Sequence, residues 1–215
     1  MGGLDSALQV LDLLGIAVFA ASGALVASRK QLDLVGFVLI GMITGFGGGT
    51  VRDLLLGRTP VFWLNQPEVP AIAAAAALLV FFFAHRVESR FKALLWADAL
   101  GMALFAVLGA EIALIAGAQP WAAVLLGTVT ATAGGIMRDV VCDELPLILR
   151  KEIYITAAAA AALAYVALRL ALLPRDVALI AAIGLGFGIR GAAIWRGWSL
   201  PAFKPRPARD YPDRR

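Results

Sequence analysis

Two short stretches decide the fold of this chain: Gly-Phe-Gly-Gly-Gly-Thr-Val-Arg-Asp at residues 45–53 and Ala-Gly-Gly-Ile-Met-Arg-Asp at residues 133–139. Both combine a run of glycines with an Arg-Asp pair, and both lie inside long apolar segments. An offset of 86 positions places Arg138-Asp139 opposite Arg52-Asp53. The sequence is therefore internally duplicated.

The duplication extends well beyond the two stretches and needs no gap. In the same register, identical residues match at Asp12 and Asp98, Gly15 and Gly101, Phe19 and Phe105, Gly23 and Gly109, Gly41 and Gly127, Thr44 and Thr130, and Pro60 and Pro146. This agreement predicts a repeated unit of three helices. Because three is an odd number, the second unit enters a membrane from the opposite side, so the repeats are inverted.

The composition is that of an integral membrane protein. Hydrophobic residues make up 61% and charged residues 16% of the 215 positions, whereas soluble domains average about 45–50% and about 25%. The single cysteine, Cys142, excludes an intrachain disulfide, and the single histidine, His85, excludes most zinc and Ser-His chemistry.

Seven apolar stretches come close to the about 20 residues that a helix needs to cross a bilayer. They are 7–27, 34–56, 69–84, 97–116, 121–141, 153–173 and 177–195. The predicted fold is an all-α integral membrane protein with seven transmembrane helices. It consists of two inverted three-helix repeats at 7–84 and 97–173, a seventh helix at 177–195, and a basic tail at 196–215.

The distribution of lysine and arginine predicts the orientation, because these residues concentrate in cytoplasmic loops. The side of the N-terminus carries Arg58, Arg169 and Arg175. The other side carries Arg29, Lys30, Arg86, Arg90, Lys92, Arg150, Lys151 and the basic tail. We therefore place the N-terminus outside and the C-terminus in the cytoplasm, and we interpret the tail as a membrane-surface segment rather than a nucleic-acid-binding one.

The glycine runs predict breaks in the second and fifth spans. Each glycine costs about 1 kcal/mol relative to alanine inside a helix, and unwound backbone at membrane depth requires burial or a hydrated cavity. We therefore expect a cavity at the breaks, with hydroxyl groups nearby. The residues concerned are Gly47, Gly48, Gly49, Gly134 and Gly135 at the breaks, and Thr44, Thr50, Thr128, Thr130 and Thr132 around them.

The charged residues inside the spans are the remaining candidates for a functional site. An ionised residue costs about 2.5–3.5 kcal/mol at the centre of a span on insertion scales, and here an Arg-Asp pair occurs in both repeats. Two interpretations remain open: Arg52, Asp53, Arg138 and Asp139 line or gate a hydrated path, or each arginine reaches the interface and neutralises its neighbour. Glu111 is a candidate cation site or an interfacial carboxylate. Asp12 and Asp98 are expected to cap helices.

An enzyme is a poor fit to this sequence. Intramembrane hydrolysis would need a Ser-His arrangement, a zinc site or an aspartyl dyad on a Gly-x-Gly-Asp motif. The sequence contains none of these patterns. The glycine run lacks the Gly-Lys-Ser/Thr ending of a nucleotide-binding loop. We expect no catalytic residues, no metal and no cofactor.

At these motifs the sequence resembles the prokaryotic trimeric intracellular cation (TRIC) channels over about residues 7–195. The resemblance implies a homotrimer in the bacterial inner membrane, in contact with lipid, with a pore for potassium and other monovalent cations in each protomer. It assigns the helix kinks to Gly47, Gly48, Gly49, Gly134 and Gly135, and the polar groups of the pore to Arg52, Asp53, Arg138 and Asp139. With the hydroxyls of Thr50 and Thr130, these residues are the predicted pore and gate. The second break, Ala133-Gly134-Gly135, departs from a full glycine triplet and leaves the extent of unwinding there open.

A transporter is the alternative interpretation. The same bacterial family is linked to glycine uptake, and inverted repeats with interrupted helices are also typical of secondary transporters. A purely structural membrane scaffold would leave the buried charges unexplained.

Overall fold

A computed structural model describes residues 2–87, 89–150 and 152–201 of the chain. These residues form seven α-helices: α1 (Gly2–Arg29), α2 (Leu34–Leu55), α3 (Glu68–Phe83), α4 (Arg90–Ile115), α5 (Pro120–Val141), α6 (Ile155–Leu170) and α7 (Arg175–Arg196). Single 3-10 turns, η1 (Phe62–Leu64), η2 (Ala84–Arg86) and η3 (Leu147–Leu149), occur in the connections. Within the described ranges, the only β pairing is an isolated bridge between Glu152 and Ser199.

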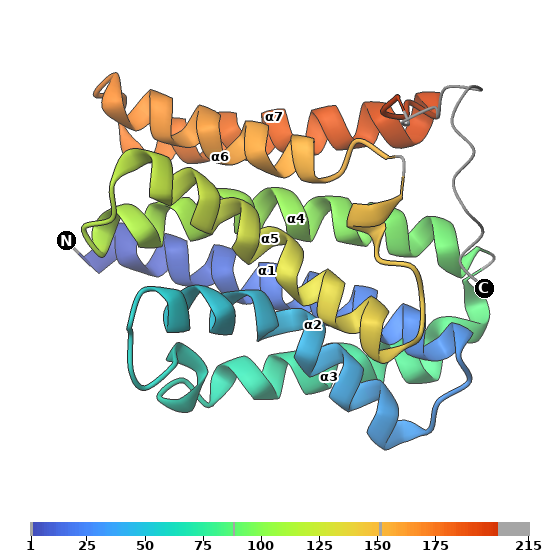
Figure 1. Ribbon diagram of the computed structural model, residues 1–215. Coiled ribbons are helices and arrows are strands. Elements are labelled where there is room, and N and C mark those ends of the chain that lie inside the picture. The colour runs from blue at the N-terminus through green and yellow to red at the C-terminus, as the bar shows by residue number, and fades with distance from the viewer. Residues whose placement is uncertain (1, 88, 151, 202–215) are drawn as a thin grey trace, which may run out of the picture.

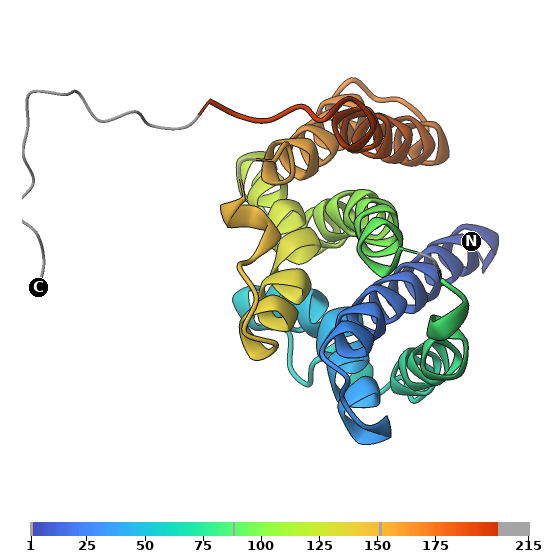
Figure 2. The same ribbon diagram turned by 90° about the vertical axis from the view of Figure 1, so that its right-hand side faces the viewer.

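Successive helices run in opposite directions through one bundle (Figure 1). We call the end at which α1 begins the near end and the opposite end the far end. Viewed almost along the helices, α4 lies in the middle, with α1 and α5 beside it (Figure 2). The packing repeats itself, because α1 contacts α2 and α3 as α4 contacts α5 and α6. The all-α fold with two inverted repeats and an added seventh helix is confirmed.

The predicted spans agree with the helices, with differences at their ends. In the described part of the chain, six helical segments are long and apolar enough to cross a membrane, with α3 counted together with η2 as Glu68–Arg86. Helix α6, with 16 residues, is shorter. Helix α4 begins at Arg90 rather than near residue 97, because the hydroxyl of Ser89 accepts a hydrogen bond from the Lys92 amide and caps a longer helix. The basic tail lies outside the described residues from position 202 onward.

The prediction of unwound breaks in the second and fifth spans is wrong. Helices α2 and α5 are α-helical from end to end, although α2 changes direction along its length (Figure 1). The threonine hydroxyls bond the carbonyls of the preceding turn, as Thr44 does to Ile40 at 2.6 Å and Thr130 to Leu126 at 2.6 Å. Such bonds bend a helix without interrupting it.

The glycines instead allow α2 and α5 to cross at close range. A β-carbon added at Gly48 would lie 2.0 Å from the carbonyl oxygen of Thr130, and one at Gly134 would lie 2.4 Å from that of Thr44. Gly134 and Thr130 are the repeat mates of Gly48 and Thr44, so the crossing is symmetric. Small residues at a helix contact in a membrane permit this backbone approach.

The prediction that Asp12 and Asp98 cap helices is also wrong. Asp12 lies well inside α1, and Asp98 lies eight residues after the start of α4 at Arg90. Asp98 is 1% exposed. A buried carboxylate needs partners, and those of Asp98 belong to the site described next.

Candidate functional site

A cluster of buried charges lies at the far end of the bundle. Arg138 of α5 is fully buried and donates hydrogen bonds to Asp98 of α4 at 2.7 Å and to its neighbour Asp139 at 2.7 Å. It also donates to the Ser22 hydroxyl of α1 at 3.1 Å. The cluster joins three helices across the interior and, together with Tyr154, is called the far cluster below.

Tyr154, which precedes α6, completes the far cluster. A β-carbon at Gly135 would have the Tyr154 hydroxyl, an Arg138 nitrogen and an Asp98 oxygen at 3.4, 3.5 and 3.6 Å, so these polar atoms surround one point. The Tyr154 hydroxyl, Arg138 Nη2 and Asp98 Oδ2 are buried and form no hydrogen bond to any described residue. Gly135 therefore faces polar groups, whereas Gly134 faces helix α2.

The repeat mates of Arg138 and Asp139 keep the same internal geometry at the near end. Arg52 Nε donates to Asp53 at 2.9 Å, and the other oxygen of Asp53 accepts from the Phe62 amide at 3.0 Å. At the far end, Asp139 accepts from the Leu147 amide at 3.0 Å in the same way. In each repeat, the aspartate thus links its arginine to the loop that follows.

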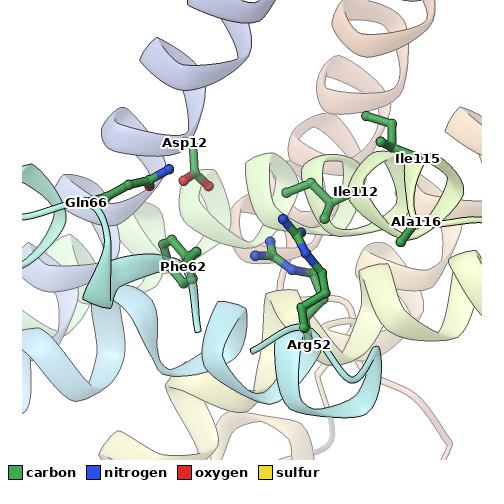
Figure 3. Close-up of a pocket in the computed structure, with 8 residues that line it drawn as sticks. Asp12, Arg52, Phe62, Gln66, Ile112, Ile115 and Ala116 are labelled. Carbon is green, nitrogen blue, oxygen red and sulfur yellow. The ribbon is translucent and has the colours of Figure 1, made fainter. Parts of the chain in front are cut away.

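The near end differs in what lies opposite the arginine. Among the described residues, Asp12, the repeat mate of Asp98, forms no ion pair, and Arg52 pairs with Asp53 and lies over the Phe62 ring. A cavity of about 310 Å³ lies between them, lined also by Phe62, Gln66 and Ile112. Figure 3 shows Asp12 and Arg52 facing this cavity from α1 and α2. We call Asp12, Arg52, Asp53 and the exposed Arg58 the near cluster.

Glu111 lies beside a second hollow of about 320 Å³ that shares Asp12, Gln66 and Ile112 with the first. Glu111 is 3% exposed. It accepts a hydrogen bond from Tyr165 at 2.5 Å and is ion-paired with Arg175. Arg175 of α7 therefore balances the charge of Glu111. The role of Glu111 as a cation site stays a prediction.

The other predicted site residues lie along α2 and α5 between the two clusters. Gly49 faces Phe62 and the Arg52 guanidinium, Gly47 faces Met137, and Thr130 is fully buried at the helix crossing. Thr50 accepts a hydrogen bond from the Trp63 indole at 3.0 Å. The structure thus separates glycines that face polar clusters, at positions 49 and 135, from those that face the partner helix.

Ser22 and Tyr154 are site residues that the sequence did not reveal. Their repeat mates are Leu108 and Glu68, so the register that identified the arginines gives no signal for them. Only the three-dimensional packing of α1 and of the segment before α6 brings them to Arg138.

Comparisons with known proteins identify the relatives of this chain. A family model described as "Glycine transporter" matches residues 9–86 and 95–169. The inner membrane protein YadS of Escherichia coli K12 is 41% identical over 148 residues, which are 68% of this chain and 72% of YadS. A membrane protein of Vibrio cholerae is 39% identical over 157 residues, 71% of this chain and 64% of its own length.

Solved structures extend the match to three dimensions. The orthologue of the TRIC trimeric intracellular cation channel from Rhodobacter sphaeroides has 51% identity and a TM-score of 0.88, over 90% of this chain and all of its own. The chain belongs to the prokaryotic TRIC family. A second TRIC cation channel has 36% identity and a TM-score of 0.84, over 93% of this chain and 98% of its own. These TRIC relatives are described as channels rather than enzymes, in agreement with the sequence.

Proposed function

We propose that this protein is a potassium-conducting channel for monovalent cations, with a pore in each protomer lined by α2 and α5. Its relatives are described as TRIC cation channels, one of them studied for conductance and another solved in 0.5 M KCl. The pore runs beside the crossing of α2 and α5, between the near and far clusters. In this proposal Arg52, Asp53, Arg138 and Asp139 gate the path.

The observation that carries the proposal is the unequal state of the two clusters. At the near end, a cavity reaches Asp12 and Arg52, whereas at the far end Asp98, Arg138 and Ser22 are bonded across the interior. Buried ionisable residues in membrane spans mark ion or substrate paths. A path that is hydrated at one end and shut by an ion pair at the other is a closed pore.

The charges of the near cluster favour cations over anions. Arg52 and Arg58 share Asp53, at 2.8 Å and 3.6 Å, so their positive charge is partly balanced. The carboxylate of Asp12 faces the cavity without a bonded cation. Asp12 is therefore a carboxylate in this cavity that is available to a cation.

Assembly and orientation belong to the same proposal. One of the solved relatives is described as trimeric, and YadS as an inner membrane protein. We infer a homotrimer in the inner membrane, in contact with lipid, with the near end outside. The basic residues at the far end support this orientation, since Arg29, Lys30 and Arg150 lie there.

Transport of glycine or another small amino acid is the second candidate function. Asp12 and Arg52 present opposite charges to a single cavity of about 310 Å³. A carboxylate opposite a guanidinium fits a zwitterion, whose ammonium and carboxylate groups are separated in the same way. The family model carries the description of a glycine transporter.

One pair of measurements on the purified protein separates the two candidates. Discrete potassium currents in planar bilayers, altered in size or open probability by Arg138→Gln, are the expected result. Saturable counterflow of radiolabelled glycine into liposomes, without unitary currents, would instead reject the channel and support the transporter.

A further inference from the structure

Helix α7, which lies outside both repeats, carries a buried arginine that belongs to neither cluster. Arg190 is 1% exposed. Its Nη1 donates a hydrogen bond to the carbonyl of Ile153 at 3.2 Å, and its Nη2 donates to the carboxylate of Glu152 at 2.5 Å. Its Nε is buried and has no hydrogen-bond partner among the described residues. A buried donor without a partner is unfavourable, so this N–H group marks a place for a ligand.

Arg190 lines a cavity of about 190 Å³ at the far end of the bundle. The beginning of α4, the segment before α6 and the end of α7 enclose it. Glu152 and Ser199 are its other polar side chains apart from the indole of Trp198. One oxygen of the Glu152 carboxylate accepts from Arg190, and no described residue donates to the other oxygen. The cavity therefore offers a cationic donor and, beside it, an anionic acceptor.

The cavity lies where the headgroups of a membrane would be. Trp195 and Trp198 are exposed at the end of α7, and tryptophans concentrate at the boundary between headgroups and hydrocarbon. Arg190 lies six positions before Arg196, the last residue of α7, which places it roughly 9 Å deeper along the helix. Helix α7 packs on α4 and α6 at the edge of the bundle (Figure 2). A lipid beside α7 can therefore bring its headgroup to Arg190.

We propose that this cavity binds the headgroup of phosphatidylethanolamine, a phospholipid that has a primary ammonium group. The phosphate accepts hydrogen bonds from Arg190 Nε and the Ser199 hydroxyl, and the ammonium group donates to the free oxygen of Glu152. Guanidinium groups are suited to phosphate, and basic pockets between transmembrane helices bind lipid headgroups. The carboxylate of Glu152 adds selectivity, because it attracts the ammonium group and repels a headgroup that carries only negative charge.

The size and walls of the cavity fit a headgroup. Pockets for whole drug-sized ligands measure about 300–1,000 Å³, so a cavity of about 190 Å³ holds a smaller group. Leu95, Ala193 and Ile194 form apolar walls, and the acyl chains stay outside in the bilayer. Because Glu152 precedes α6 and Arg190 belongs to α7, a bound headgroup bridges these two parts of the chain.

The test measures lipid binding to the purified, delipidated protein by native mass spectrometry. Phosphatidylethanolamine is compared with phosphatidylcholine, whose trimethylated nitrogen has no N–H group to donate to Glu152, and with phosphatidylglycerol, which has no ammonium group. We expect both to bind at least about tenfold more weakly than phosphatidylethanolamine, the effect of one hydrogen bond to a charged group. Equal affinity for phosphatidylethanolamine and either of the other lipids would overturn the proposal.

A charge-balanced variant locates the site. Arg190→Gln combined with Glu152→Gln replaces the ion pair without leaving one buried charge unpaired. It is expected to bind phosphatidylethanolamine at least about tenfold more weakly and to lose the preference over phosphatidylcholine. The matched control, Arg29→Gln with Glu144→Gln, removes another far-end ion pair, of 3.1 Å, and should keep both. A preference that survives in the first variant would overturn the site.

A soluble competitor separates a lipid from a free phosphoester. Phosphoethanolamine has the same charged groups without acyl chains, and we expect it not to displace the lipid at equal concentration. Displacement would overturn the lipid as the ligand. The comparison of the three lipids uses the unmodified protein, so it decides the proposal even if the double variant does not fold. Binding needs no conduction, so the outcome is independent of the proposed potassium currents.

Discussion

The packing of Gly48 against α5 makes a prediction about stability that can be worked from the structure. In Gly48→Ala, the new methyl carbon would lie 2.0 Å from the Thr130 carbonyl oxygen, and ordinary contact begins at 3.4 Å. The obstacle is backbone rather than a flexible side chain, so α2 and α5 must separate by more than 1 Å. Overpacking of this kind costs about 1–3 kcal/mol, which exceeds the gain of about 1 kcal/mol from replacing a helical glycine.

The assay is thermal denaturation in detergent, followed by the loss of the monodisperse peak in size-exclusion chromatography. Gly184→Ala is the matched control, because Gly184 is also inside a helix but has no atom within 4 Å of the added carbon. We expect Gly48→Ala to melt several degrees below Gly184→Ala. The melting temperature of the double variant Gly48→Ala and Gly134→Ala should fall by less than the sum of the two single decreases. A single separation of α2 from α5 relieves both contacts. Equal melting of Gly48→Ala and Gly184→Ala would refute the close crossing.

Two other predictions concern charge and topology. Arg138→Gln leaves two buried carboxylates without their cation, which lowers the free energy of unfolding by about 3–5 kcal/mol. The control Arg58→Gln, at an exposed position, lowers it by about 1 kcal/mol or less. Similar melting temperatures of the two variants would contradict the ion pairs of the far cluster. In a Cys142→Ala background, Leu56→Cys should react with an impermeant maleimide added to intact cells and the exposed Leu145→Cys should not. Labelling of both positions from outside would contradict the inverted repeats. The background removes the single native thiol, so any labelling comes from the introduced cysteine. Burial raises the pKa of the Cys142 thiol, so its own reaction is expected to be slow.

The sequence is informative about the helices because their determinants are local. Apolar length predicts each span, and the register of Arg52 with Arg138 predicts the inverted repeat. Apolar length predicts too late a start for α4, because residues 90–96 include charged side chains. The Ser89 cap includes these residues in the helix.

The site was only partly predictable because its geometry depends on contacts between distant segments. The four residues of the Arg-Asp pairs stand out by repetition. The glycines predict a break because intrinsic helix propensity is a local property of the sequence. The stabilisation from close packing of α2 against α5 is not local, so the sequence does not reveal it. The sequence suggests a helix cap at Asp98, because an acidic residue at the edge of an apolar stretch is typical of a helix start. Its pairing with Arg138, 40 positions away in the chain, requires the packed bundle.

The contact between Gly48 and Thr130 has a consequence for the ancestry of the fold. The contact between Gly134 and Thr44 matches it. Each repeat thus contains one glycine and one threonine of this kind, and the glycine of each repeat contacts the threonine of the other. A surface that recognises itself in this way is isologous, as in a two-fold symmetric dimer. A half-length chain of three helices would therefore satisfy both contacts by pairing with an inverted copy of itself. Fusing two such chains would yield the crossing seen here without any new complementarity having to arise.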